Sequence, residues 1–401
     1  MKRHFIKKYI FTVLFLLTLY GYSIINFKEE GAEVLEVCRN YDGENIGSLI
    51  QQVESSINEN VYEKYSWIEV YGTTQEILGT NVENGFSYAK DSEGALYYAN
   101  ESYQQDCVEN NINQMIQITE IAEEAGAKSF VLLAPDKYDE GKDTYEAGIP
   151  YVNDNPVLDQ VVVALQEEEV PYIDTRDYIE DIETQTEETL FYNTDHHWRT
   201  KAAFYMFQRL VGGIEAAYDE NLDPQGVYCD LENYNMVHYE NYFLGSMGRE
   251  TGVAYAGLDD FDLIYPKFDT NYEHTYQTTA DSDEVVLRGN FMSSILETYN
   301  MRDDTSIYET DRYSVYLGAV NMEDHILNLN QKEGPKVLII RDSFMAPVAA
   351  FFSEVCSEVD LIWDIRYGES IEELIRNGNY DYVIIESGTN NLANEDIYLG
   401  L

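Results

Sequence analysis

The pattern of hydrophobic positions separates an uncharged N-terminal stretch from a long region in which helical and strand-like segments alternate. Tyr9 to Phe27 holds 19 residues without a charged side chain, long enough to cross about 30 Å of hydrocarbon as one helix. Acidic Glu29 and Glu30 follow closely. The basic residues that precede the stretch are Lys2, Arg3, Lys7 and Lys8. This asymmetry predicts a membrane anchor with the N-terminus in the cytoplasm and the rest of the chain on the extracellular face.

A cleaved signal peptide is the alternative for the same segment. Cleavage needs small residues in an A-x-A-like site, and the best local candidate, Gly21-Tyr22-Ser23, fits poorly. The sequence therefore favours a retained anchor over residues 1–27. Residues 28–106 are expected to form a stalk and an edge of the main domain. Within them, Ile57 to Leu78 has a helical or irregular pattern, and residues 84–100 contain short aromatic strands separated by Asn and Gly turns.

Helix and strand signals alternate clearly from Val108 onward. Apolar residues from Ile112 to Ala122 recur at helical spacing, and a short apolar strand is expected at Phe130–Ala134. A second helix over Leu158–Leu165 precedes a strand at Tyr172–Asp174. Alternation of this kind indicates βαβ units and a parallel sheet with both faces covered by helices.

The same pattern returns near the C-terminus. A helix is expected over Ala346–Cys356, and Ser370 with Glu373 forms a capping box for a short helix that ends near Gly378. Three more strands are expected at Val337–Ile340, Val359–Trp363 and Tyr382–Ile385. The intervening residues 213–330 are rich in Tyr, Asp, Asn and Gly, and we expect them to form a β-rich insertion lying over the sheet. The main α/β domain thus spans residues 107–401.

Composition limits the function. The chain has 401 residues with 44% hydrophobic and 13% aromatic side chains, enough apolar surface to favour a folded core. Against 74 acidic residues stand 25 Lys and Arg, and the net charge is -49. Such a chain repels a phosphate backbone, so nucleic acid is excluded as a partner. Neutral or cationic partners are expected instead.

The four cysteines do not form a metal-binding pattern. They are far apart in the sequence and include no C-x-x-C pair, which argues against a zinc site. In an exported chain they allow one or two disulfides, whose pairing the sequence does not choose, or they serve as small buried hydrophobic side chains. These residues are Cys38, Cys107, Cys229 and Cys356.

Two segments carry candidate catalytic groups next to predicted elements of the sheet. Asp195, His196 and His197 precede a helix-like run, and Ser343 directly follows the strongest predicted strand. A serine on a strand-to-helix turn is well placed as an acyl-transfer nucleophile, with its backbone N–H free to help bind an oxyanion. His197 is the natural base, and Asp195 would fix its tautomer and stabilise the imidazolium.

Structural roles compete with this interpretation. Asp195 would also serve as a helix N-cap, and Ser343 as an ordinary loop serine. The adjacent pair His196 and His197 could ligate a metal, but metal ligands on a helix usually recur at i and i+4, so no metal is predicted.

The string Asp195-His196-His197-Trp198, followed by Arg341-Asp342-Ser343-Phe344, resembles the DHHW family of bacterial surface proteins. That family is similar to the SGNH-like alginate O-acetyltransferases. The likeness covers residues 108–401 and includes weaker landmarks at Phe243-Leu244-Gly245-Ser246 and Tyr316-Leu317-Gly318. It implies an SGNH-hydrolase-like fold in a permuted order, in which the aspartate and histidine precede the serine.

The resemblance also implies roles and partners. Ser343 corresponds to the nucleophile, His197 to the general base and Asp195 to its orienting carboxylate, with no cofactor. Arg341 stands where glycine or lysine is usual and would narrow the pocket or contact an anionic substrate group, while Asn321 is a candidate oxyanion donor. Such proteins often work beside a multi-pass membrane O-acyltransferase (MBOAT) that delivers acetyl groups to an extracellular glycan. The expected function is therefore O-acetylation of a cell-surface polysaccharide or wall polymer.

Two other functions fit the same sequence. An esterase would use the same three residues with water as the acceptor, because no motif records how well a pocket excludes water. A non-catalytic, glycan-binding scaffold of an export or modification complex would not require the three residues to converge.

Overall fold

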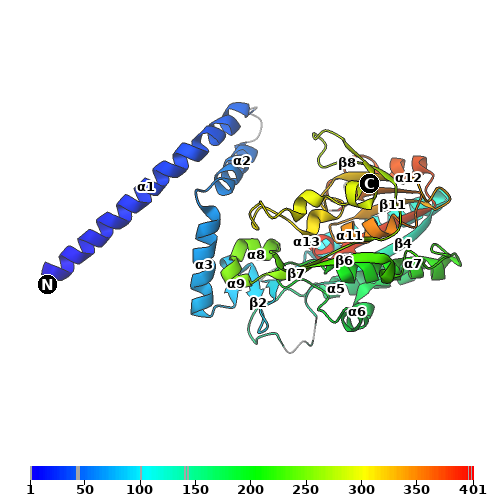
Figure 1. Cartoon of the computed structure of the whole chain (residues 1–401), viewed down its shortest axis with the longest axis horizontal. Coiled ribbons are helices and arrows are strands. Elements are labelled where there is room, and N and C mark those ends of the chain that lie inside the picture. The colour runs from blue at the N-terminus through cyan, green and yellow to red at the C-terminus, as the bar shows by residue number, and fades with distance from the viewer. Residues whose placement is uncertain are drawn as a thin grey trace. The chain divides into compact units, whose positions relative to one another are not determined.

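The computed structural model describes residues 2–41, 46–99, 102–139, 141, 144–395, 397–398 and 400–401. It divides into two compact units, Met1–Thr74 and Gln75–Leu401. Figure 1 labels the elements of both, and each unit is described separately below.

The first unit contains one long apolar helix. Helix α1 spans Lys2–Asn40, followed by α2 at Ile46–Glu59 and the start of α3 at Lys64–Leu78. Within α1, the 20 residues Tyr9–Lys28 have a mean hydropathy of 1.8, and by length and composition they could cross a membrane or act as a signal sequence. Large apolar side chains such as Phe11 lie exposed along this segment. The side chains of Lys2, Arg3, Lys7 and Lys8 lie outside the described part of the structure.

The second unit is built on an eight-stranded mixed sheet, with strand order β5-β4-β13-β11-β12-β10-β8-β9. The first five of these strands run parallel, and β10, β8 and β9 continue the sheet in antiparallel pairing. The strands are β4 Lys128–Ala134, β5 Tyr172–Asp174, β8 Tyr272–Gln277, β9 Val285–Gly289, β10 Glu323–Asn328, β11 Lys336–Arg341, β12 Glu358–Trp363 and β13 Tyr382–Gly388.

The parallel sheet expected from the sequence is confirmed for the five parallel strands, but the whole sheet is mixed. The three antiparallel strands come from residues 213–330, and they extend one edge of the sheet where an overlying insertion was expected. Alternate residues of β10 are buried and half-buried, a pattern typical of an antiparallel strand with one wetter face. The remaining strands of this region, β6 at Tyr234–Phe243 and β7 at Asp259–Pro266, form a separate two-stranded pair.

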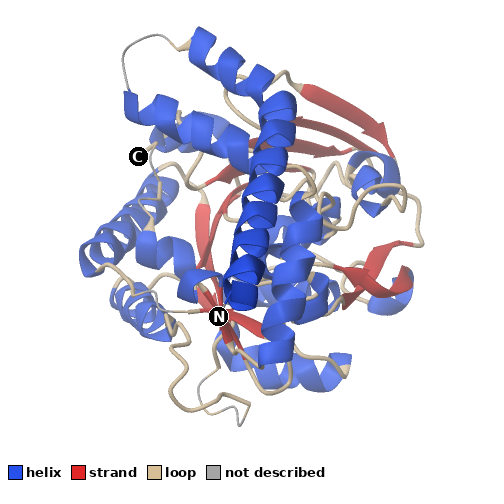
Figure 2. Cartoon of the chain, turned by 90° about the vertical axis from the view of Figure 1, so that its left-hand side faces the viewer, coloured by secondary structure: helices blue, strands red, loops and turns tan. Residues whose placement is uncertain are grey.

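Helices cover both faces of the sheet because successive strand residues point to opposite sides. Phe130 and Leu132 of β4 belong to the core cluster that includes residues of α7 and α11, while Val131 and Leu133 belong to the cluster with residues of α4, α5, α12 and α13. Figure 2 shows the strands in red with helices around them. These helices are α4 Gln105–Glu124, α5 Asn155–Glu167, α7 Thr200–Tyr218, α11 Met345–Phe352, α12 Ile371–Gly378 and α13 Thr389–Asn394.

Shorter elements complete the unit. A three-stranded sheet holds β1 Val82–Glu83, β2 Tyr88–Lys90 and β3 Leu96–Tyr98, so short aromatic strands form as expected. The shorter helices are α6 Ile179–Thr186, α8 Ser246–Thr251, α9 Val253–Ala256 and α10 Phe291–Ser294, with 3-10 turns at Asn84–Phe86, Thr175–Tyr178, Leu231–Asn233, Thr298–Met301 and Tyr313–Val315.

The structure confirms one local prediction and corrects others. The Ser370 side chain accepts a hydrogen bond from the Glu373 N–H at 3.1 Å and caps α12, which ends at Gly378. The helix after β11 is shorter than expected, because α11 ends at Phe352. All four cysteines are free, so the possible disulfides are not formed, and Cys356 is fully buried as a small hydrophobic side chain.

The buried face of α11 gives a test of the core. Phe351 is fully buried and packs edge-on against Phe204 of α7, with 5.1 Å between ring centroids. We expect Phe351→Ala to lower the free energy of unfolding by about 3–5 kcal/mol, because it removes a large side chain and leaves a cavity. Val163→Ala on α5, where the side chain is 53% exposed, should change it by less than about 0.5 kcal/mol. Chemical unfolding of the two variants measures the difference, and equal stabilities would contradict this packing.

Candidate active site

Polar residues gather where the parallel strands end. The carboxyl ends of parallel strands meet at one edge of a sheet, where loops lead into helices. Asp136 and Lys137 follow β4, Asp342 and Ser343 follow β11, and Asp364 follows β12. This edge is therefore the place where groups distant in the sequence come together.

Asp195, His197 and Ser343 form a continuous hydrogen-bonded chain at this edge. The Nε2 atom of His197 lies 2.7 Å from Ser343 Oγ, although the two residues are 146 positions apart in the sequence. The Nδ1 atom of the same ring lies 2.6 Å from Asp195 Oδ1. With a carboxylate at Nδ1, the imidazole carries its proton there and presents Nε2 as an acceptor to the serine hydroxyl.

The carboxylate of Asp195 is buried and held from two sides. Its Oδ1 accepts the backbone N–H of His197 at 3.0 Å, and its Oδ2 accepts that of Ser246 at 2.6 Å. Burial raises the pKa of Asp195, but the rings of His197 and His196 and these hydrogen bonds outweigh it and hold the pKa well below its usual range. Gly245 allows the backbone before Ser246 to lie close to Asp195, because a Cβ at position 245 would lie 2.3 Å from Asp195 Cβ. The carboxylate thus stays ionised at neutral pH.

Aromatic rings fix the plane of the His197 imidazole. The ring of Tyr313 stacks on it with 3.9 Å between centroids and an interplanar angle of 14°. Phe344 lies at 5.0 Å and His196 at 3.9 Å. Trp198, fully buried, packs edge-on against Phe344. These contacts leave the imidazole little freedom to rotate away from Ser343.

The turn that carries Ser343 is held by the preceding aspartate. One carboxylate oxygen of Asp342 accepts the Phe344 N–H at 2.8 Å, and the other accepts the Gly388 N–H at 2.7 Å. The Asp342 N–H in turn donates to Glu386 Oε2 at 3.1 Å. Asp342 therefore ties the serine turn to the end of β13.

Two further carboxyl groups lie buried beside Asp342. Burial raises the pKa of Glu386 and of Asp364 well above its usual range, and the charge of Asp342 raises both further. Burial also raises the pKa of Asp342 itself. Burial and the nearby charge of Asp342 therefore both favour the protonated forms of Glu386 and Asp364.

The loop that carries Asp195 is clamped by a buried lysine. Lys137 is 8% exposed, and its ammonium donates to the backbone carbonyls of Tyr192 at 2.6 Å, Asn193 at 3.1 Å and Asp195 at 2.7 Å. Burial lowers the pKa of Lys137 to about 7, against the opposing charges of Asp259 and Asp195. An ammonium has three N–H donors, and here each has a carbonyl acceptor.

The opposite side of the same loop is held by Asp259. Its carboxylate accepts the backbone N–H groups of Asn193 and Thr194, each at 2.8 Å, and the Thr194 hydroxyl at 2.7 Å. Arg199 pairs with this carboxylate at 3.1 Å. Lys137 binds the carbonyls of this loop and Asp259 binds its amides. Together they hold the backbone in the position that places Asp195 beside His197.

A cavity of about 100 Å³ opens beside Ser343. The aromatic side chains of Tyr98, Phe344 and Trp363 line it, together with polar residues from the ends of β4 and β13. The hydroxyl of Tyr98 lies 3.4 Å from His196 Nδ1. The serine therefore faces a small pocket with both apolar and polar walls.

The structure does not bring Arg341 and Asn321 to this cavity. Arg341 is fully buried, and its guanidinium donates to the carbonyls of Ala319 at 2.5 Å and Asn321 at 3.2 Å and pairs with Asp324 at 3.2 Å. The Asn321 amide donates to Leu317 O at 3.0 Å and to Asp324 Oδ1 at 2.8 Å. Contrary to expectation, neither Arg341 nor Asn321 lines the cavity at Ser343, and both instead contact Asp324.

Within the described part of the chain, two groups of side chains could geometrically hold a metal ion. In the first, Asp195, His196 and His197 present ligand atoms within 4.8 Å of one another, but a metal would replace the hydrogen bonds that link His197 to Asp195 and Ser343. The second group combines His325 with two acidic residues, and both acids already have partners. Glu358 pairs with Lys336 at 2.6 Å, and Asp360 accepts from the Tyr380 hydroxyl at 2.6 Å.

Sequence reasoning missed several groups of the site. Lys137 and Asp136 follow the end of β4, so the strand-end argument that pointed to Ser343 could also have found them. Tyr313 and Asp259 lie in the middle region, and no motif marks them. Gly245 and Ser246 belong to the family-like segment Phe243-Leu244-Gly245-Ser246, to which the sequence assigned no role.

Part of the chain matches a known protein family. Residues 92–230, which include Asp195 and His197, match the family described as "SGNH hydrolase-like domain, acetyltransferase AlgX". Residues 92–230 thus match an SGNH hydrolase-like domain of the AlgX acetyltransferase type. The matched segment ends before Ser343. No curated protein sequence matches the chain.

Several solved structures share the fold of this chain. A DHHW family protein from Eubacterium siraeum aligns with 18% identity and a TM-score of 0.53, over 77% of this chain and 96% of the other. Bacillus cereus PatB1 aligns with 15% identity and a TM-score of 0.61, over 77% and 98%. A second structure of PatB1 carries a sulfonyl adduct, with 15% identity and a TM-score of 0.59, over 77% and 96%.

The lysine clamp can be tested by substitution. We expect Lys137→Met to lower kcat for ester hydrolysis by about 10- to 100-fold, because a small displacement of the loop misplaces Asp195 and His197. The loss should fall on kcat more than on KM, because Lys137 lines the cavity but its ammonium donates to three backbone carbonyls. Lys128→Met is the matched control, because Lys128 is half-exposed at the other end of β4 and pairs with Glu220. A Lys137→Met variant with unchanged kcat would show that the clamp has no part in positioning.

Proposed function

We propose that this chain transfers an acetyl or similar acyl group to a hydroxyl of a cell-surface polysaccharide or wall polymer, with Ser343 as nucleophile, His197 as general base and Asp195 as its orienting carboxylate. The observation that carries the proposal is the 2.7 Å distance from His197 Nε2 to Ser343 Oγ, with Asp195 at 2.6 Å behind the ring. Nucleophile, base and orienting group at these distances are what covalent acyl transfer requires.

In the first half of the reaction, Ser343 Oγ attacks the carbonyl carbon of the acyl donor and its proton passes to His197 Nε2. The ionised Asp195 stabilises the imidazolium, and the backbone N–H of Ser343 serves as one oxyanion donor. The tetrahedral intermediate then breaks its bond to the donor's leaving group, which takes the proton from His197. The product is an acyl ester on Ser343.

In the second half, a sugar hydroxyl attacks the ester carbonyl on Ser343. Its proton passes to His197 Nε2 as the new carbon-oxygen bond forms, and the same proton returns to Ser343 Oγ as the enzyme ester breaks. Water as the acceptor gives hydrolysis, so the esterase alternative uses the same steps. The AlgX-type acetyltransferase domain favours transfer.

We infer the arrangement in the cell from the N-terminal helix. Residues 1–27 would hold the protein in the membrane with its N-terminus inside, and the SGNH-like domain, in its permuted order, would lie on the extracellular face. The support is the apolar segment Tyr9–Lys28 of α1 together with the basic residues before it. A multi-pass membrane O-acyltransferase would then be positioned to supply acyl groups at the outer surface.

Loss of the nucleophile tests the physiological function. In cells that make the full chain with Ser343→Ala, we expect the O-acetyl content of surface glycans to fall to the level of a strain without the gene, because no acyl ester can form. Ser102→Ala, at an exposed position, should retain the wild-type content. Alkaline release and quantification of acetate measures both, and unchanged acetylation in Ser343→Ala would remove the proposal.

Activation of the serine can be tested apart from any glycan. A sulfonyl fluoride, which reacts with activated serines, should modify Ser343 in the wild-type chain, as mapped by mass spectrometry of its peptides. We expect His197→Ala to slow the modification by about 100-fold or more, because general-base assistance is lost while the serine remains. Equal rates in wild type and His197→Ala would mean that the hydrogen bond to Ser343 does not activate it.

A further inference from the structure

His196 lies in the wall of the Ser343 cavity, directly beside the imidazole of His197. The two ring centroids are 3.9 Å apart with an interplanar angle of 36°. The cavity is lined by His196 as well as by Ser343, and the His196 side chain is 26% exposed. A substrate at Ser343 therefore meets the edge of a second imidazole, to which the steps above assign no role.

The polar contacts of His196 within the described structure are all made by one nitrogen. Its Nδ1 atom lies 3.3 Å from Ser246 Oγ, 3.4 Å from the Tyr98 hydroxyl and 3.5 Å from Asp195 Oδ1. The second polar atom of the ring, Nε2, has no hydrogen bond to any described residue. The exposed edge of the ring therefore offers Nε2 to a group in the cavity.

The surroundings of His196 keep its ring neutral. Burial and the nearby His197 lower the pKa of His196 to about 3, against the opposing charge of Asp195. His238 on β6 shows the contrasting case, because it is half-exposed and its hydrogen bond to Asp262 raises its pKa. A neutral imidazole has one N–H donor and one acceptor nitrogen. His196 can thus bind a hydroxyl without taking the catalytic proton from His197.

The second half of the proposed reaction brings an acceptor to the same place. The attacking hydroxyl must lie within about 2.6–3.2 Å of His197 Nε2 to give up its proton. Because the two imidazole rings are 3.9 Å apart, a hydroxyl on the carbon next to the reacting one comes within reach of His196. Water, the acceptor in hydrolysis, carries no such second hydroxyl.

We propose that His196 is a substrate-binding residue that selects acceptors with a hydroxyl adjacent to the reacting one, as in the 1,2-diols of a polysaccharide, and so favours transfer over hydrolysis. The inference rests on the proposed function and names its acceptor class. His196 Nε2 holds the adjacent hydroxyl, while the reacting hydroxyl passes its proton to His197 Nε2 and attacks the ester carbonyl on Ser343. The same proton returns to Ser343 Oγ as the enzyme ester breaks, and the acceptor leaves as its ester.

Two isomeric diols test this preference directly. The full chain in detergent receives 4-nitrophenyl acetate as donor and either trans-1,2- or trans-1,4-cyclohexanediol at equal concentration, and the diol monoacetate and free acetate are quantified. Both isomers carry two hydroxyls, but they are adjacent in the 1,2-diol alone. We expect the ratio of transfer to hydrolysis to be about three- to tenfold higher with the 1,2-diol, as one additional hydrogen bond predicts. Equal ratios would overturn the inference.

Substitutions at His196 locate the origin of the preference. The measured ratio compares two fates of one ester on Ser343, so it is independent of how fast that ester forms. His196→Phe keeps a ring against His197 without nitrogens and should bring the two diols to within about 1.5-fold of each other. His196→Gln places an amide nitrogen near the position of Nε2 and should retain a preference of about twofold or more. An unchanged preference in His196→Phe would contradict the assigned residue.

A further variant keeps the assignment testable if His196→Phe fails to fold. The side chain of His196→Asn ends near the position of Nδ1 and does not reach that of Nε2, so this variant should also lose the preference. A preference retained in His196→Asn would contradict the role of Nε2.

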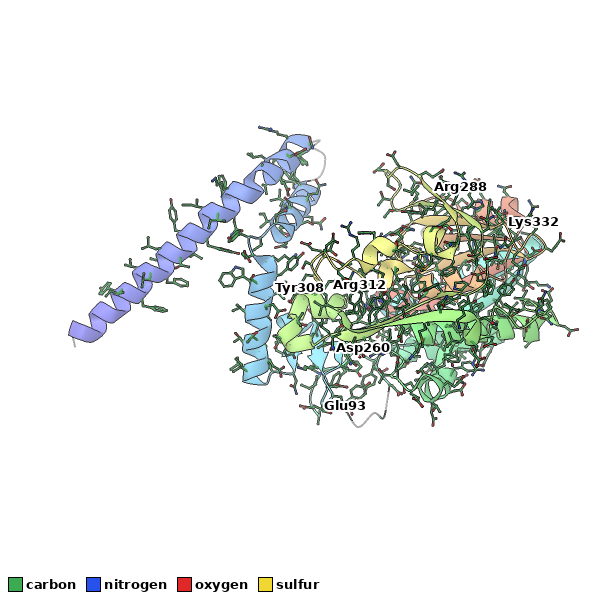
Figure 3. The ribbon with its side chains drawn as sticks, viewed as in Figure 1. Glu93, Asp260, Arg288, Tyr308, Arg312 and Lys332 are labelled. Atoms are coloured by element: carbon green, nitrogen blue, oxygen red, sulfur yellow. The ribbon has the colours of Figure 1, made fainter. Side chains whose placement is uncertain are left out.

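His238→Phe is the matched control. His238 also faces two aspartates of β7, Asp262 at 2.8 Å and Asp260 at 3.7 Å, and Figure 3 labels Asp260. The described lining of the Ser343 cavity includes none of these three residues. The control should therefore keep the wild-type preference for the 1,2-diol. Equal loss of the preference in His238→Phe and His196→Phe would overturn the assignment to His196.

The same assay distinguishes failure of this inference from failure of the proposed function. Release of 4-nitrophenolate with acetate as the sole product, in the presence of either diol, would overturn the selection of diols while leaving Ser343 active. Absence of 4-nitrophenolate release from the wild-type chain would count against the proposed function, and the role of His196 would fall with it.

Discussion

The hydrogen bond between His197 and Ser343 is the contact on which the proposed chemistry depends, and the topology of the sheet makes it possible. The two residues are 146 positions apart, so chain proximity cannot bring them together. Parallel strands can do so because their carboxyl ends share one edge, where the loop before α7 meets the turn after β11. The antiparallel strands β10, β8 and β9 continue the sheet beyond β12, while β4, β13, β11 and β12 remain parallel.

Much of the surrounding structure keeps that contact in place by satisfying buried charge. Asp195 is ionised because two histidine rings and two backbone N–H groups compensate its burial. Lys137 and Asp259 are buried near it, and each forms hydrogen bonds with the backbone of the 192–195 loop. Burial instead raises the pKa of Glu386 and of Asp364, which favours their neutral forms. A buried charge without such partners would cost several kcal/mol. Removing one partner should therefore destabilise the site by more than the intact pair stabilises it.

The sequence predicted the parallel core of the sheet because each central strand is a continuous apolar run bounded by helical periodicity. It could not predict that β10 would pair with β12 and that β8 and β9 would continue the sheet, because short alternating strands fit either an overlying layer or a sheet edge. The motif residues Asp195, His197 and Ser343 could be located from strand ends and resemblance. Arg341 could not be placed, because its role depends on which face the last residue of β11 points to, and that face holds Asp324. Lys137 belongs to no sequence motif. Its role in holding the loop is visible only in the structure, where its ammonium donates to three backbone carbonyls.

The account's central claim is that Ser343 carries the acyl group during the reaction. The most direct measurement is rapid acid quenching of the full chain during turnover of 4-nitrophenyl acetate, followed by digestion and mass spectrometry. The account predicts an acetylated peptide containing Ser343 in the wild type, with longer persistence of the acetyl group in His197→Ala if that variant is acetylated chemically beforehand. An enzyme that turns over the ester with no acetyl group on Ser343, or with the acetyl group on a different side chain, would contradict it.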